Sequence, residues 1–156
     1  MKKSLDLTNE TIDKSRNVIR NVSPVSIYGL SFQTAIIQYI QSLKEKNGLI
    51  IHFTELEEIT CSNDQNNQIF RILQEIILNA VKHSKAKKLE IEISKSNNYL
   101  LIRTADDGIG FDTTSNNRIG FGLLIIESKV DYLNGTLKIN EENKKGTQFN
   151  IRIPLD

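Results

Sequence analysis

Apolar residues recur with a helical period in four segments of the chain. In the second segment, Ser31 is a suitable N-cap and Asn47-Gly48 is a stop signal. The first segment is mostly polar and has only a sparse apolar stripe, so it needs a partner helix. The predicted helices cover about residues 4–20, 32–47, 63–83 and 121–133.

Between these helices the period of apolar residues falls to two, which predicts strands. Leu89, Ile91 and Ile93 alternate with charged residues before a Ser96-Asn97-Asn98 turn, which indicates a hairpin. The predicted strands cover about residues 49–53, 88–95, 99–104, 136–140 and 147–153. Because helices and hairpins do not alternate as regular βαβ units, we predict an α+β two-layer sandwich. Its mixed, mostly antiparallel sheet is covered by helices on one face.

The composition excludes some classes of protein but does not indicate a function. The 156 residues include 20 Lys and Arg against 19 Asp and Glu, a net charge of +1, and 38% are hydrophobic, as in one soluble globular domain. A charge near zero argues against direct nucleic-acid binding. Cys61 is the single cysteine and His52 and His83 are the two histidines, so disulfides and zinc spacings are absent.

No apolar run in the sequence approaches the roughly 18 to 20 residues that span a bilayer. The polar start also lacks the hydrophobic stretch of a signal peptide. We therefore expect this chain to be cytoplasmic and to make no membrane contact of its own. A cytoplasmic domain of a membrane-anchored sensor is compatible with this expectation.

The long third helix carries a polar stripe of Arg71, Glu75, Asn79 and Lys82 within about a quarter of its circumference. An ordinary amphipathic helix with a solvated polar face would explain such a stripe. Asn79 weakens that explanation, because Asn is a poor helix former whereas an amide oxygen suits Mg²⁺. In the second interpretation, Glu75 holds a metal-bound water or acts as a base, and Lys82 and His83 meet phosphate.

A second motif, Asp-Asp-Gly-Ile-Gly-Phe from Asp106 to Phe111, directly follows the predicted strand at 99–104. Its glycines, Gly108 and Gly110, permit close backbone approach. The motif is neither a dinucleotide fingerprint nor a P-loop. It is either a glycine-rich turn or a site at which the carboxylate of Asp106 accepts a hydrogen bond from an exocyclic amino group such as that of adenine.

The third motif runs from Arg118 to Leu123, with the sequence Arg-Ile-Gly-Phe-Gly-Leu, and leads into the last predicted helix. Glycines at a helix N-terminus leave backbone N–H groups free at the positive end of the helix dipole, which favours an anion. A flexible start of a packing helix is the alternative interpretation.

The order and spacing of these motifs resemble the ATP-binding domain of the GHKL superfamily, which includes sensor histidine kinases, gyrase-type topoisomerases, heat-shock chaperones and mismatch-repair ATPases. The segments QEIILNAVKHS, DDGIGF, GFGLLIIESKVDYLNGTLKI and KKGTQFNIRIPL are most similar to histidine kinases that pair with LuxR/NarL-type response regulators. The resemblance covers about residues 63–155 and implies the Bergerat ATPase fold. It implies that residues 1–30 are the end of a dimerisation helix with its linker, and residues 31–156 the kinase domain.

Carried over by position, the resemblance implies that ATP and Mg²⁺ bind this chain. Asn79 would bind Mg²⁺, Glu75 would help to activate the reaction, and Asp106 would recognise the adenine amino group. Thr147 would support the adenine pocket through Asp106. The resemblance implies that ATP also contacts Lys82, His83, Gly108, Gly110, Arg118, Gly120, Phe121, Gly122 and Leu123.

One departure from the family concerns the acceptor histidine, because no motif of that kind occurs from Met1 to Arg20. We therefore expect this sequence to be part of a longer, homodimeric kinase, in preference to a natural protein without its own acceptor. The predicted function is a catalytic domain that donates the γ-phosphate of ATP to a histidine upstream of this chain. The alternatives are an anti-sigma-type serine kinase of the same fold and a non-catalytic, nucleotide-dependent interaction module.

Overall fold

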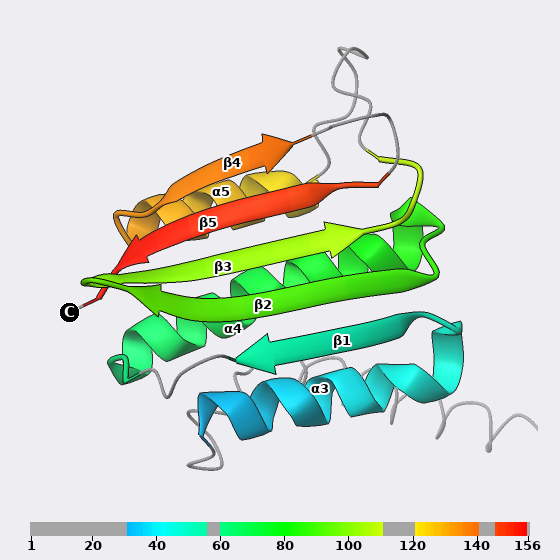
Figure 1. Ribbon diagram of the computed structural model, residues 1–156, viewed down its shortest axis with the longest axis horizontal. Coiled ribbons are helices and arrows are strands. Elements are labelled where there is room, and N and C mark those ends of the chain that lie inside the picture. The colour runs from blue at the N-terminus through cyan, green and yellow to red at the C-terminus, as the bar shows by residue number, and fades with distance from the viewer. Residues whose placement is uncertain (1–30, 56–59, 111–120, 141–145, 156) are drawn as a thin grey trace, which may run out of the picture.

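The computed structural model describes residues 31–55, 60–110, 121–140 and 146–155. In this part of the chain, a five-stranded sheet is covered on one face by helices (Figure 1), which confirms the predicted α+β sandwich. The elements in chain order are α3 (Phe32–Asn47), β1 (Ile50–Glu55), α4 (Asn63–Asn79), the π-helix η1 (Ala80–Ser84), β2 (Lys88–Ser96), β3 (Tyr99–Asp106), α5 (Phe121–Tyr132), β4 (Thr136–Asn140) and β5 (Gln148–Pro154). The helix predicted at about residues 4–20 lies outside the described residues.

The sheet has the strand order β1-β2-β3-β5-β4. Strand β1 runs parallel to β2, and the other three pairs are antiparallel, so the sheet is mixed and mostly antiparallel as predicted. The β2–β3 hairpin pairs Ser96 with Tyr99 across a turn in which Asn97 has a positive φ of 53°. Asn accepts this left-handed conformation more readily than most residues, which explains the position of the predicted turn.

The ends of the first two described helices follow from their capping residues. The side chain of Ser31 accepts a hydrogen bond from the Thr34 N–H at 3.2 Å, and the helix is capped after Asn47 by Gly48, which has a left-handed φ of 66°. The side chain of Ser62 caps α4 in the same way, by accepting from the Gln65 N–H at 3.3 Å. Side-chain caps of this kind satisfy backbone donors that the helix leaves free.

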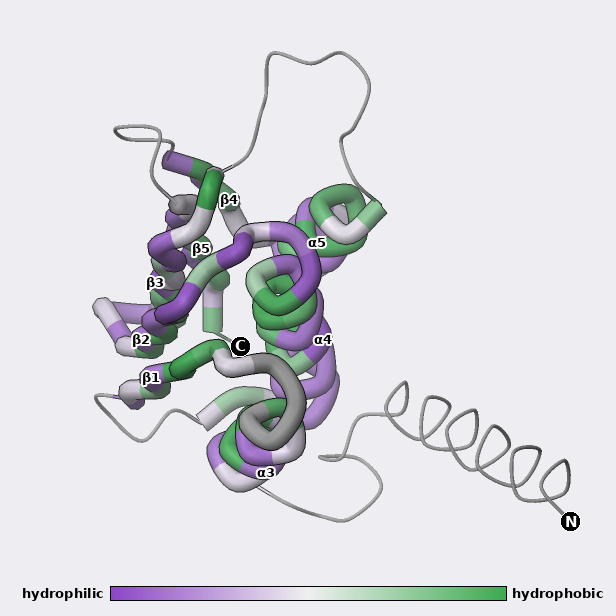
Figure 2. Tube along the Cα trace, turned by 90° about the vertical axis from the view of Figure 1, so that its right-hand side faces the viewer, coloured by the Kyte–Doolittle hydropathy of each residue, from purple (hydrophilic) through white to green (hydrophobic). Residues whose placement is uncertain are grey.

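The core lies between the sheet and the helices, which form separate layers in Figure 2. The side of α4 away from the polar stripe is buried there, and the rings of Tyr39 and Phe70 meet edge to face at 5.8 Å between centroids. Each such fully buried apolar side chain contributes about 1.5–3 kcal/mol. The largest fully buried side chains are Ile36, Ile69, Phe70, Ile72, Leu73, Ile77, Leu89, Ile91, Ile93, Leu100, Ile102 and Ile126.

The end of the long helix differs from the prediction of one regular α-helix to about His83. The α-helix ends at Asn79, and the chain continues through the single π turn of η1 to Ser84. A π turn holds more residues than an α turn, and such turns are frequent at functional sites. Here the turn is closed by the Ser84 hydroxyl, which donates to the Ala80 carbonyl at 2.7 Å.

In the described part of the chain, none of the helices has the length and apolar character that a membrane span requires.

Candidate functional site

A cavity of about 560 Å³ lies where the end of α4, the π turn η1, the C-terminal end of β3 and the start of α5 meet. It brings together most of the residues predicted for the site. Gly108 adjoins the cavity through a hydrogen bond to Asp106, whereas Arg118 and Gly120 lie outside the described residues. The lining residues are Glu75, Ile76, Leu78, Asn79, Ala80, Lys82, His83, Ser84, Asp106, Gly110, Phe121, Gly122, Leu123, Thr147 and Phe149.

Asp106 forms one end of the cavity, at the last position of β3. Its Oδ1 atom accepts a hydrogen bond from the Gly108 N–H at 2.8 Å, and its own N–H donates to the Thr147 carbonyl at 3.0 Å. Burial raises the pKa of the Asp106 carboxyl, and hydrogen bonds from Gly108 and Thr147 oppose that rise. The result is a half-buried acceptor whose position is fixed by backbone contacts.

Gly146 closes the backbone around Asp106. It has a φ of 77°, and a Cβ atom at this position would collide with the Asp106 carbonyl. The Gly146 N–H donates to the Gly108 carbonyl at 2.6 Å, which ties the start of β5 to the loop after β3. Only glycine combines this left-handed φ with so close an approach.

Asn79 forms the other end of the cavity, at the last residue of α4. Its Nδ2 atom is buried and has no hydrogen-bond partner among the residues that the structure describes. The amide lies against the start of α5, because a Cβ atom on Gly122 would stand 2.9 Å from Asn79 Oδ1. A buried polar group without a partner costs roughly 1–3 kcal/mol, so this amide is suited to a ligand that supplies the missing contact.

Three further polar side chains surround Asn79. Glu75 lies one turn earlier on α4 and is half-buried, whereas Lys82 and His83 are exposed on the π turn. Among the described residues, no group of three or more His, Cys, Asp or Glu side chains could hold a metal ion. Mg²⁺ is typically held by one or two protein groups together with phosphate oxygens and water, which fits an amide with a neighbouring carboxylate and no fuller cage.

The sequence did not indicate several apolar or small residues that line the cavity, notably Ser84 and Phe149. Phe149 is buried on β5, beside Thr104 of β3 and Ile139 of β4. Strand alternation marks Phe149 as a core residue, but it does not reveal which core residues border an open space. Phe121, at the start of α5, is 88% exposed, so a large apolar side chain stands at the cavity mouth.

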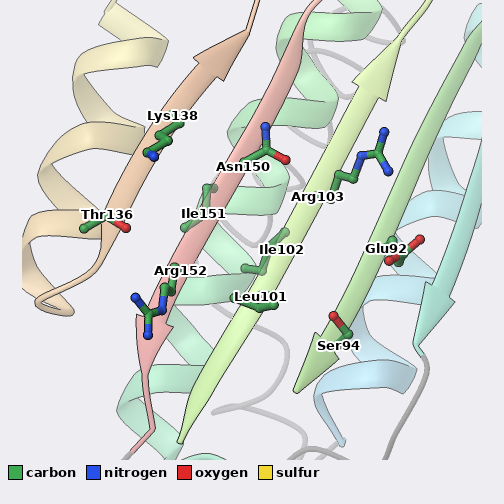
Figure 3. Close-up of a pocket in the computed structure, with 10 residues that line it drawn as sticks. All are labelled: Glu92, Ser94, Leu101, Ile102, Arg103, Thr136, Lys138, Asn150, Ile151 and Arg152. Carbon is green, nitrogen blue, oxygen red and sulfur yellow. The ribbon is translucent and has the colours of Figure 1, made fainter. Parts of the chain in front are cut away.

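A second hollow, of about 390 Å³, lies on the open face of the sheet (Figure 3). Its side chains come from strands alone and include Arg103, Lys138, Asn150 and Arg152. None of its lining residues belongs to the predicted set. None of its side-chain atoms is among the buried unpartnered atoms of the described residues, so it offers no counterpart to the Asn79 amide.

Residues 64–156 match the model of the family described as "Histidine kinase-, DNA gyrase B-, and HSP90-like ATPase". An uncharacterised sensor-like histidine kinase of Chloroflexus aurantiacus is 26% identical over 90% of this chain and 25% of its own length. The histidine-protein kinase/phosphatase DegS of Bacillus subtilis is 29% identical over 85% of this chain, which spans 36% of that protein. In structure, a blue-light activated histidine kinase of Erythrobacter litoralis aligns with a TM-score of 0.69 at 17% identity, covering 83% of this chain and 43% of that one.

Proposed function

The chain belongs to the histidine kinase-, DNA gyrase B- and HSP90-like ATPase family, and from this premise we propose that its cavity binds Mg-ATP for transfer of the γ-phosphate to a protein histidine. The chain spans only 25% and 36% of the two curated relatives, both named as histidine kinases, so the acceptor histidine is proposed to lie in another segment of a longer, homodimeric protein.

One observation carries the proposal: a fixed carboxylate acceptor and a buried amide nitrogen border the same cavity. Asp106 offers the carboxylate at one end, and at the other end Asn79 offers an amide nitrogen that has no hydrogen-bond partner within the described part of the chain. An adenine amino group is a donor that suits the first, and a Mg²⁺-phosphate group presents the oxygen and metal chemistry that suits the second. ATP carries both groups in one molecule.

The reaction would form a bond between an imidazole nitrogen and the γ-phosphorus while the bond to the bridging oxygen breaks and ADP leaves. Phosphoryl transfer depends mainly on positioning and charge stabilisation. Asn79 would hold Mg²⁺, which offsets phosphate charge when bound, and Lys82 would add a cation at the mouth. Glu75 would accept the proton that the imidazole releases.

The partner is proposed at a finer level from the sequence motifs. The segments around Glu75, Asp106 and Gly122 resemble kinases that pair with LuxR/NarL-type response regulators. We infer that a regulator of this type receives the phosphate from the acceptor histidine.

The proposed function is tested by mixing the purified chain with γ-labelled ATP, Mg²⁺ and a fragment that carries an acceptor histidine. We expect label on the fragment that is stable to base and lost in acid, as for a phosphorus–nitrogen bond. Asn79→Ala should lose the label, and Asn150→Ala, on the open sheet face, should keep it. Label on serine, or equal label with both variants, would contradict the proposal.

A further inference from the structure

Ser84, at the end of the π turn, uses its hydroxyl as donor and acceptor at once. The Oγ atom donates to the Ala80 carbonyl at 2.7 Å and accepts from the Ala86 N–H at 3.0 Å. The residue is 8% exposed, so water does not readily replace these bonds. The next residue, Lys85, is left-handed with a φ of 54°, and the chain turns away from the helix there.

The backbone of Ser84 makes a second set of contacts, to the loop that follows β3. The Ser84 carbonyl accepts a hydrogen bond from the Ile109 N–H at 2.8 Å. A Cβ atom on Gly108 would collide with that carbonyl and would stand 2.7 Å from the Ser84 Cβ. The π turn and the glycine loop are therefore in direct contact, with no side chain between them.

These contacts join the two ends of the cavity through one residue. On one side, Ser84 ends the turn that carries Lys82 and His83 and directly continues the helix of Asn79. On the other side, Ser84 holds the loop in which Gly108 donates to the Asp106 carboxylate at 2.8 Å. The separation of Asn79 and Asp106 thus depends on the shape of the π turn.

We propose that Ser84 is a positioning residue that sets the spacing between the Asp106 end and the Asn79 end of the cavity. The inference rests on the proposed function, because the spacing matters only to a ligand that spans both ends. Ser84 fixes the turn through its hydroxyl and the loop through its carbonyl. A ligand that occupies one end alone does not depend on that spacing.

The side-chain chemistry restricts which residues could replace Ser84. Alanine leaves the Ala80 carbonyl and the Ala86 N–H without their shared partner, so the turn is free to relax towards a regular α-helix. Threonine keeps a hydroxyl that both donates and accepts. The pair Ser84→Ala and Ser84→Thr therefore separates the hydroxyl from the bulk of the side chain.

The test compares two probes by titration calorimetry: adenosine, which occupies the Asp106 end alone, and Mg-ATP, which spans both ends. The measured quantity is the dissociation constant of adenosine divided by that of Mg-ATP. This ratio states how much more tightly Mg-ATP binds than adenosine. We expect Ser84→Ala to lower the advantage of Mg-ATP over adenosine about ten-fold and Ser84→Thr to restore it. Ile36→Val, in the core on α3, which contributes no residue to the cavity lining, is a control that lowers stability and should leave the ratio unchanged.

Gly108→Ala provides a second variant in case Ser84→Ala does not fold. Its added Cβ would collide with the Ser84 carbonyl and so displace the same contact between the π turn and the loop after β3. It should also reduce the ratio. An unchanged ratio in the folded variant, with normal binding by the parent chain, would overturn the role of Ser84 and leave the proposed function intact. Failure of the parent to bind Mg-ATP would instead refute the proposed function, and the inference with it.

Discussion

The two ends of the cavity are built from different kinds of contact. At the Asp106 end, the carboxylate is held by Gly108 and Thr147, and Gly146 packs its backbone against the same residue. At the Asn79 end, the groups are side chains of one helix and its π turn, and the buried amide nitrogen has no hydrogen-bond partner in the described residues.

From this difference we infer that the Asp106 end recognises the base and the Asn79 end takes part in the chemistry of the phosphate. A fixed acceptor discriminates between bases because its hydrogen bonds are already oriented before binding. At the Asn79 end, the ligand itself supplies the contact that the amide lacks in the described residues. We expect the largest gain in binding free energy there when the ligand is charged. We therefore expect changes at the Asp106 end to alter folding as well as binding, and changes at the Asn79 end to alter binding alone.

The largest effect is expected for Gly146→Ala, which tests the rigidity of the Asp106 end. The added Cβ would collide with the Asp106 carbonyl at a left-handed φ, so the free energy of unfolding should fall by about 3 kcal/mol or more. Urea denaturation measures this loss. Gly48→Ala is a matched control, because Gly48 also has a left-handed φ of 66° but nothing lies within 4 Å of the added Cβ. It should cost only about 1 kcal/mol, and equal losses would argue against a special closure at Gly146.

The second prediction concerns Asn79→Ala, which tests the other end. Removing the amide should weaken Mg-ATP binding by roughly thirty-fold and abolish the benefit of added Mg²⁺. The free energy of unfolding should change by less than about 1 kcal/mol, because the buried nitrogen has no hydrogen-bond partner to lose among the described residues. Calorimetry with and without Mg²⁺, together with thermal denaturation, gives both numbers. A melting temperature lower by many degrees would assign Asn79 a structural role instead.

A smaller effect is expected for Gly122→Ala, which displaces the Asn79 amide without removing it. The new Cβ would stand 2.9 Å from Oδ1 and 3.0 Å from Nδ2, so the amide must shift by a few tenths of an ångström. Mg-ATP affinity should fall about five-fold, less than for Asn79→Ala, since a misplaced ligand retains part of its interaction. Ser128→Ala, exposed on the same helix, is the control and should bind like the parent. A full loss in Gly122→Ala would point to a role of the backbone at the start of α5.

The smallest effect is the pH dependence of stability at Asp106. Because burial raises the pKa of this carboxyl, the folded state holds its proton more tightly than the unfolded state does. The stabilisation from protonation is complete below the unfolded pKa and is lost as the pH rises through the higher folded pKa.

Asp106→Asn removes this titration. Relative to the variant, the parent should therefore lose stability as the pH rises from about 3 to 7, which thermal denaturation at several pH values would measure. A gap that moves in the opposite direction would show that hydrogen bonds, and not burial, dominate the pKa of Asp106.

The fold was predicted well from sequence wherever local chemistry decides the structure. The Ser31 side chain caps the start of α3, and the left-handed backbone of Gly48 caps its end. The alternation at Leu89, Ile91 and Ile93 predicts the buried face of β2. The helix caps and the strand alternation depend on residues that are close in sequence, so the sequence pattern is sufficient to predict them.

The sequence was less informative about how the cavity is assembled. The π turn depends on hydrogen bonds of Ser84 and on the contact of its carbonyl with a loop 25 residues later, at Ile109. Periodicity cannot report such a contact, because one extra residue in a turn hardly alters the apolar pattern. The sequence also did not indicate that Phe149 lines the cavity. The alternation of a strand predicts that this side chain is buried, but the same alternation occurs whether or not a buried residue borders a cavity. The roles of Arg118 and Gly120 stay predictions, because both lie outside the described residues.

We propose that one cavity holds adenine at Asp106 and Mg²⁺-phosphate at Asn79. Titration calorimetry of the parent chain with ATP, in the presence and absence of Mg²⁺, tests it most directly, with Asp106→Asn as the matched variant. We expect one binding site, tighter with Mg²⁺, and a loss of affinity of at least about thirty-fold in the variant. No Mg²⁺-dependent binding by the parent chain, or equal affinity in parent and variant, would contradict it.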